Sequence, residues 1–72
     1  MLDENLSRLA LALDTSDWPT FIRWCRFFGP RVGVLKLGLE AFTRWGLRGV
    51  EVARRDANGL FLDLKLHDIP NT

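Results

Sequence analysis

The sequence predicts an α/β protein built around a small parallel sheet. Three apolar runs suited to strands occur at residues 9–14, 32–38 and 60–66. Segments with a helical period separate them, and this β-α-β-α-β alternation is typical of parallel strands joined by crossover helices. A chain of 72 residues is long enough for one small domain, which buries only about 60% of the surface that its unfolded form exposes.

The first strand and the first helix have clear sequence signals. Residues 9–14 are almost entirely apolar, which predicts a strand covered on both faces. Within residues 15–30, five apolar side chains fall on one helical face: Trp18, Phe21, Ile22, Cys25 and Phe28. We expect Thr15 or Ser16 to cap the start of this helix and Gly29 to end it.

The second strand, residues 32–38, leads into a second helix. That helix is expected to begin at Leu39 and to break at Gly46 and Gly49, because glycine weakens a helix. It resumes over residues 50–56. The sequence thus predicts two helical pieces between the second and third strands.

The third strand follows a turn at Asn58 and Gly59 and runs over residues 60–66. Alternate residues of a strand point to opposite sides, so Asp63 and Lys65 face one way. The other side, expected to face the helices, takes the leucines: Leu62, Leu64 and Leu66. One face of this strand therefore carries opposite charges.

Composition and charge exclude several classes of function. Hydrophobic residues make up 47% and charged residues 26% of the chain, as in ordinary globular domains. The net charge is +1 and no basic run exceeds Arg54 and Arg55, so we expect neither a nucleic-acid nor a membrane partner. The single cysteine, Cys25, excludes an internal disulfide. With no secretory signal and no apolar run near 18 residues, we expect a cytoplasmic protein.

Lysine is used at two positions only, Lys36 and Lys65, both inside strand-like runs. Arginine supplies the other basic side chains. This choice indicates sites that need a compact ammonium able to give up a proton, which arginine cannot do. The alternative is that each lysine extends from a strand end into water.

A suitable register between the second and third strands would bring Lys36 onto the face that holds Asp63 and Lys65. Burying such charges costs several kcal/mol per ion unless their geometry is good, so the cluster is a poor way to stabilise a fold. Function explains it better. The alternative is a structural ion-pair network.

Three further polar residues have two interpretations each. Asp68, five residues after Asp63, is expected in the loop beyond the strand, where it can cap the next element or reach a site in another subunit. His67, the only histidine, is either a general base or a histidine with its hydrogen bonds satisfied at a strand end. Glu40 is either a metal ligand or an acid in the first turn of a helix.

Three motifs lie at the ends of the predicted strands. They are LALD at the first strand, LKLGLEAF at the second and FLDLKLHDIPNT at the third. In this order and spacing they resemble the N-terminal third of the orotidine 5'-monophosphate decarboxylase family, over about residues 9–72. The resemblance implies a (β/α)8 TIM barrel, of which residues 1–72 would supply about the first three strands as a single segment.

The resemblance also implies roles for four charged residues. Asp14 would bind the ribose of the nucleotide, and Lys36 would hydrogen-bond the ribose and hold Asp63 in place. Asp63 would lie against the substrate carboxylate. Lys65 would protonate C6 of the pyrimidine as carbon dioxide leaves, with neither a metal nor an organic cofactor.

A homodimer with shared active sites is also implied. In the family, the equivalents of Asp68, Ile69 and Thr72 reach into the partner subunit's active site. This would account for the offset of Asp68 from the charged face of the third strand.

A related branch is the enzyme alternative. Keto-gulonate phosphate decarboxylases and hexulose phosphate synthases share an Asp-x-Lys-x-x-Asp core but bind magnesium. The HDIPNT sequence after Lys65 favours the orotidylate branch, and a magnesium requirement would indicate the other.

The segment from Met1 to Thr72 lacks the later strands that hold the pyrimidine and the phosphate in this family. Remote phosphate contacts supply binding energy that catalysis uses, so we expect these residues alone to have little or no decarboxylase activity. An open three-stranded sheet also leaves its charged face and both edges uncovered. A truncated, non-catalytic fragment or assembly module is therefore the alternative of a different class.

Overall fold

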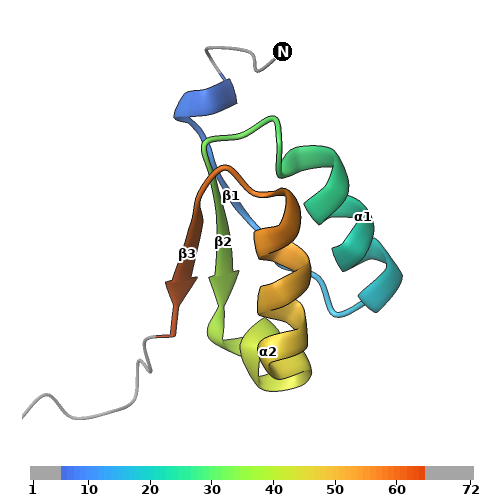
Figure 1. Cartoon of the computed structure of the whole chain (residues 1–72). Coiled ribbons are helices and arrows are strands. Elements are labelled where there is room, and N and C mark those ends of the chain that lie inside the picture. Colours follow the sequence, from blue (N-terminus) through green and yellow to red (C-terminus); the bar gives the residue numbers. More distant parts are fainter. Residues whose placement is uncertain (1–5, 65–72) are drawn as a thin grey trace, which may run out of the picture.

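The computed structural model describes residues 6–64, which form a three-stranded sheet and two α-helices (Figure 1). The elements in chain order are η1 (Leu6–Arg8), β1 (Ala10–Ala12), α1 (Trp18–Phe28), β2 (Val34–Gly38), α2 (Leu39–Asp56) and β3 (Leu60–Asp63), where η1 is a 3-10 turn. The predicted β-α-β-α-β order is confirmed. No helix in this part of the chain is long and apolar enough to cross a membrane.

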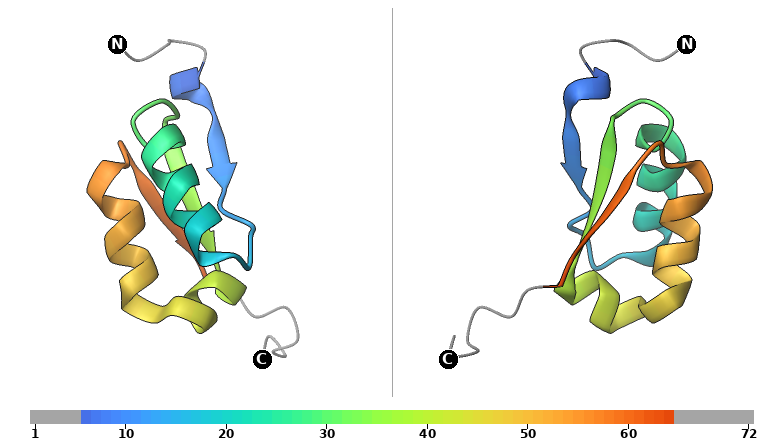
Figure 2. Two further views of the ribbon diagram at one scale, coloured as in Figure 1. Left: turned by 90° about the vertical axis from the view of Figure 1, so that its right-hand side faces the viewer. Right: turned by 60° about the vertical axis from the view of Figure 1, so that its left-hand side comes forward.

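The sheet is parallel, with the strand order β1-β2-β3. Both α-helices lie on one face of it (Figure 2), and the opposite face carries no other element of residues 6–64. The carboxyl ends of the three strands meet at one edge, where α2 begins (Figure 1). Side chains near these ends are therefore brought together from distant parts of the sequence.

The first strand is shorter and more exposed than the sequence predicts. β1 covers only Ala10–Ala12, with Ala10 and Ala12 exposed and Leu11 half-buried. The prediction of a strand covered on both faces is wrong for the described residues, because both helices lie on the same face. Strand β2 likewise begins at Val34 and β3 extends to Asp63, and the remainder of the predicted third strand beyond residue 64 lies outside the described residues.

Asp17, and neither Thr15 nor Ser16, caps α1. Its backbone is extended (φ −98°, ψ 114°), and its carboxylate accepts a hydrogen bond from the Thr20 backbone N–H at 3.1 Å. The predicted cap was wrong because three consecutive residues can all act as caps, and only the point at which helical backbone begins selects one. The predicted end at Gly29 is confirmed.

The second helix bends at Gly46. This residue has φ 60° and ψ −144°, and helical backbone lies on both sides of it; glycine adopts a positive φ without the steric cost of a side chain. Gly49 is helical and buried, so the predicted break there is wrong. A Cβ at Gly49 would lie 3.3 Å from the Cβ of Trp45, which makes Gly49 a site of close packing.

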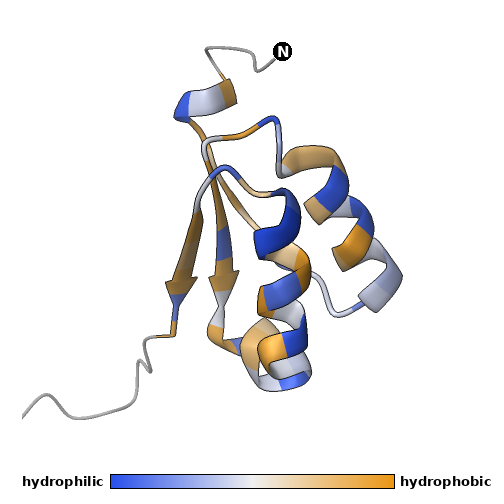
Figure 3. Ribbon diagram, in the orientation of Figure 1, coloured by the Kyte–Doolittle hydropathy of each residue, from blue (hydrophilic) through white to orange (hydrophobic). Residues whose placement is uncertain are grey.

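The core lies between the sheet and the helices. Phe21 stands at its centre, with the rings of Trp18 and Trp45 at centroid distances of 5.5 and 4.5 Å. Hydrophilic and hydrophobic positions alternate along both helices (Figure 3), and the buried residues of each helix, such as Cys25 of α1 and Ala53 of α2, belong to the core. The buried hydrophobic residues are Leu13, Phe21, Cys25, Val32, Leu35, Leu37, Ala41 and Ala53.

Asn58 joins the turn before β3 to the segment that precedes β2. Its Nδ2 donates hydrogen bonds to the carbonyl of Pro30 at 3.2 Å and to that of Val32 at 2.9 Å. Its backbone N–H donates to the carbonyl of Gly29 at 3.3 Å. The turn was predicted from the sequence, and its side-chain bonds fix the starts of β2 and β3 next to each other.

Candidate active site

Lys36 lies in the central strand and points to the open face of the sheet. Its neighbours Leu35 and Leu37 are completely buried on the helix-covered side. Because successive side chains of a strand point to opposite faces, Lys36 projects away from the helices. It is half-buried, and its ammonium group belongs to the open face.

Asp63 lies on the same face at the end of β3. Lys36 pairs with Phe61, and Gly38 pairs with Asp63. Asp63 is thus two residues nearer the carboxyl ends of the strands than Lys36. A strand spacing of about 4.8 Å and a rise of about 3.3 Å per residue put the Cα atoms of Lys36 and Asp63 about 8 Å apart. The register that the sequence analysis required is the one observed.

Asp14 joins this face from the other side of Lys36. Ala12 pairs with Lys36, and the Leu13 N–H donates to the Lys36 carbonyl at 2.9 Å, which carries the ladder past the end of β1. Leu13 is 2% exposed whereas Asp14 is exposed. Burial thus alternates from Ala12 to Asp14, and extending the register of β1 by two residues puts Asp14 diagonal to Lys36, as Asp63 is.

Lys36 and Asp63 thus share the open face near the carboxyl edge of a parallel sheet, and the exposed Asp14 follows the end of the neighbouring strand. Carboxylates accept hydrogen bonds from hydroxyl groups, and an ammonium donates to oxygen atoms. In α/β barrels and doubly wound sheets, small molecules bind at this edge. The three residues Asp14, Lys36 and Asp63 therefore suit a ligand that carries both hydroxyl groups and negative charge.

The other predicted site residues lie outside the described residues: Lys65, Asp68, Ile69 and Thr72, together with His67. Their roles stay predictions. Within residues 6–64, no group of three or more histidine, cysteine, aspartate or glutamate side chains is placed to hold a metal ion. Glu40 lies in the first turn of α2, where a negative charge complements the helix dipole.

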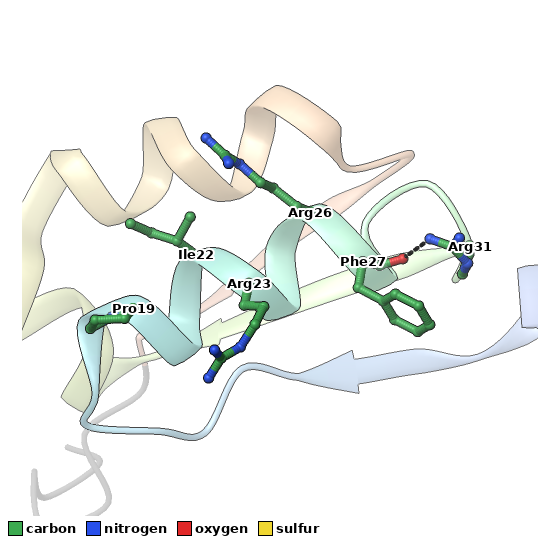
Figure 4. A pocket seen from close by; sticks show the side chains of 6 residues that line it. All are labelled: Pro19, Ile22, Arg23, Arg26, Phe27 and Arg31. Carbon is green, nitrogen blue, oxygen red and sulfur yellow. Dashed lines mark hydrogen bonds between the residues drawn. The ribbon is translucent and has the colours of Figure 1, made fainter.

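A groove on α1 lies on the other side of the sheet (Figure 4). Residues of α1 and the turn after it line this groove: Pro19, Ile22, Arg23, Arg26, Phe27 and Arg31. The Arg31 guanidinium donates to the Phe27 carbonyl and lies 4.1 Å from the centroid of the Phe27 ring. The lining contains no carboxylate and none of the predicted site residues, so the candidate site is the open sheet face.

Comparison with protein families shows to which family the chain belongs. The model of the orotidine 5'-phosphate decarboxylase / HUMPS family matches residues 7–72. The chain belongs to this family. The match includes Asp14, Lys36 and Asp63. The family has the TIM-barrel fold, and the strands and helices of residues 6–64 form a βαβαβ portion of such a barrel.

Individual relatives in this family are similar over nearly all of the chain. The orotidine 5'-phosphate decarboxylase of Thermobifida fusca is 49% identical over 65 residues, 89% of this chain and 28% of the relative. Those of Syntrophus aciditrophicus and Syntrophotalea carbinolica are 44% and 43% identical, over 96% and 100% of this chain and 28% and 30% of the relatives. The chain thus spans less than a third of the length of these curated relatives. No solved structure matches it.

Proposed function

We propose that this chain supplies the charged strand ends of an orotidine 5'-phosphate decarboxylase, which converts orotidine 5'-phosphate to uridine 5'-phosphate and carbon dioxide. The observation that carries the proposal is the strand register, which brings Asp14, Lys36 and Asp63 to one edge of the open face. Membership in the family, and relatives that bear this enzyme's name, support it. We propose that the reaction takes place in the cytoplasm.

The proposed chemistry relies on fixed charges. The bond between C6 and the substrate carboxylate breaks, its electron pair stays at C6, and carbon dioxide leaves. The ammonium of Lys65 then gives its proton to C6. Preorganised charges directed at developing negative charge are often the largest contribution to catalysis, so no metal or organic cofactor is required.

The three residues at the described strand ends would serve this step by binding and by holding charge in place. Asp14 accepts a hydrogen bond from the ribose, and Lys36 donates one to the ribose. Lys36 lies on the same face as Asp63, two residues back along the ladder, so its ammonium would also hold Asp63 in place. Asp63 then lies against the substrate carboxylate and fixes the Lys65 ammonium beside C6.

The direct test is release of carbon dioxide from carboxyl-labelled orotidine 5'-phosphate in the presence of EDTA. The protein to assay is the product of the complete reading frame that contains residues 1–72. We expect turnover without metal, and we expect Lys65→Ala to abolish it while the protein still folds. No turnover by the wild-type protein would overturn the proposed function, and normal turnover by Lys65→Ala would remove Lys65 from the role of proton donor.

The second candidate comes from the HUMPS branch, which the description of the matching family names. Asp63, Lys65 and Asp68 fit the Asp-x-Lys-x-x-Asp spacing that both branches share. A protein of that branch would show no orotidylate turnover and would require magnesium with a sugar phosphate substrate. The EDTA assay therefore separates the two candidates.

A homodimer is part of the proposal. Asp68, Ile69 and Thr72 would contribute to the partner subunit's site, so Asp68→Ala should impair turnover across the interface. Mixed dimers that combine Asp68→Ala subunits with Lys65→Ala subunits provide the test. Partial recovery of turnover is expected if each site draws Asp68 from the neighbouring subunit, and its absence would contradict the shared site.

Residues 1–72 alone are proposed to be inactive. The relatives that bear the enzyme's name are more than three times as long as the matched region. Among residues 6–64, no element covers the sheet face that bears Lys36. A decarboxylation assay of this polypeptide, after its mass has been verified, should give no turnover; turnover would show that the charged strand ends suffice.

A further inference from the structure

We infer that Gly38 keeps a gap open between Asp14 and Asp63 so that the substrate can approach the backbone of β2 closely. This inference rests on the proposed function and adds a residue that determines which ligands fit. Its basis is a glycine for which the fold supplies no need, at the one position where a side chain would separate the two carboxylates.

Gly38 lies level with Asp63, and extending the β1–β2 register by two residues puts Asp14 level with it as well. It pairs directly with Asp63 in the β2–β3 ladder. On the other side, Ala12 pairs with Lys36, and Asp14 follows Ala12 by two residues, as Gly38 follows Lys36. With about 4.8 Å between neighbouring strands, this extended register gives a separation of about 10 Å between the Asp14 and Asp63 Cα atoms, with the Gly38 backbone between them.

The backbone at Gly38 does not require glycine. Its φ of −85° and ψ of 175° are extended values that every residue type adopts. Among the described residues, a Cβ built at Gly38 meets no atom within 4 Å. Two other positions do require glycine. Gly46 has a φ of 60°, and a Cβ at Gly29 would come within 3.0 Å of the backbone of Asp56.

The fold would gain from a different residue at position 38. Gly38 ends a strand, where glycine is disfavoured because it loses more conformational freedom than other residues on folding. It is also the N-cap of α2 and provides no side-chain hydrogen bond to the helix. Serine at an N-cap accepts such a bond and stabilises the helix. Glycine is a tolerated N-cap, so local stability favours serine only slightly and gives no positive reason for glycine at position 38.

Close approach of a ligand is such a reason. Glycine inside a strand often marks a place where a ligand or another backbone comes near. Any side chain at position 38 would point to the open face, as Lys36 does. It would lie between the carboxylates of Asp14 and Asp63. With glycine, a flat ring with an attached sugar can rest on the β2 backbone while polar groups on both sides contact it.

The test compares Gly38→Ser and Gly38→Thr with the wild-type product of the complete reading frame. Both residues can cap α2, so the melting temperature should stay the same or rise by a few degrees. Because the gap is filled, the KM for orotidine 5'-phosphate and the dissociation constant of uridine 5'-phosphate should rise at least about tenfold, and more for threonine than for serine. Ala10→Ser adds the same hydroxyl to an exposed residue at the other end of this face and should leave both constants within about twofold of wild type.

Each contrary result has a distinct meaning. If the wild-type protein turns over orotidylate and Gly38→Ser binds both ligands normally, the inference about Gly38 fails and the proposed function stands. If Gly38→Ser lowers the melting temperature markedly, the fold needs the glycine, and the inference also fails. If the wild-type protein has no orotidylate turnover, the proposed function fails and the inference falls with it.

Discussion

Lys36 of β2 and Asp63 of β3 lie on the same face of neighbouring parallel strands, one pleat apart in the ladder. Twenty-six positions separate them in the sequence, and only the pairing of Lys36 with Phe61 brings them to this diagonal. Asp14 follows β1 by two residues, and extending the register of Ala12 with Lys36 puts it diagonal to Lys36 on the other side.

The cap of α1 should make the stability of the protein depend on Asp17. Its carboxylate accepts hydrogen bonds from the Thr20 hydroxyl at 2.6 Å and from the Thr20 N–H at 3.1 Å. Asp17→Ala removes both and should lower the melting temperature by a few degrees. Ser16→Ala, one residue earlier and without a capping bond to the helix, is the control and should leave it unchanged. Equal effects of the two substitutions would contradict the cap.

The same cap should produce a pH dependence in the acid range. The hydrogen bond from the Thr20 side chain, followed by the one from its backbone, holds the pKa of Asp17 below its usual value, with Arg23 adding to the effect. A pKa depressed by folding contributes stability that is present above about pH 4 and is lost as the pH falls through the folded pKa. Urea unfolding from pH 6 to pH 2 should therefore show a smaller loss for Asp17→Asn, which still caps but does not ionise in this range. Identical profiles would contradict the assignment.

Asn58 should contribute more to stability than an ordinary turn residue. Its Nδ2 donates to carbonyl groups of the segment between α1 and β2. Asn58→Ala removes this donor and leaves the carbonyl groups without its hydrogen bonds. We expect a loss of about 1–2 kcal/mol in the free energy of unfolding. Asn58→Asp, nearly identical in shape, replaces the donor by an acceptor that repels the carbonyls, and it should be at least as damaging. An aspartate variant as stable as the wild type would contradict the role of the donor.

Cys25 should be chemically inert in the folded protein. Burial, with a smaller contribution from Asp56, raises the pKa of its thiol to about 11, and the thiolate is the reactive form. A thiol reagent at pH 8 should therefore label the native protein slowly and the urea-unfolded protein rapidly. Rapid labelling of the native protein would contradict the buried position.

The raised pKa of Cys25 also predicts a loss of stability in alkali. Because folding raises the pKa, the contribution is fully present below the unfolded value near pH 9 and declines as the pH approaches 11. Cys25→Ser has no thiol to ionise and is the matched control. Unfolding free energies at pH 8 and pH 10.5 should fall more for the wild type than for the serine variant, and parallel declines would contradict this cause.

The fold could be predicted where the signal is local. The leucines on either side of Lys36 identify a strand with one polar position, but which face of the sheet Lys36 shares with Asp63 depended on the register between the strands. The helix cap could not be predicted as well, because Thr15, Ser16 and Asp17 are all suitable residues. The shorter β1 and its open face depend on which side the crossover helices take, and no local pattern in residues 9–14 contains that information.

The candidate site was predictable in part for the same reason. Strand periodicity put Asp63 on one face, but its position relative to Lys36 is a matter of register, which depends on how distant segments pair. The role of Gly38 could not be predicted, because a glycine at this place in a sequence is equally typical of a turn or of a helix boundary. Its significance emerges only when its backbone angles, the empty space at its Cβ and its pairing with Asp63 are seen together.

The central claim is that the open face bearing Lys36 is the catalytic face. The most direct measurement is kcat/KM for orotidine 5'-phosphate in Lys36→Ala, made in the complete reading-frame product. Arg55→Ala is the control, since it removes an exposed positive charge at the end of α2. We predict a loss of at least about 100-fold for Lys36→Ala, and a value within about twofold of wild type for Arg55→Ala. A Lys36→Ala protein with near-normal kcat/KM would contradict the account.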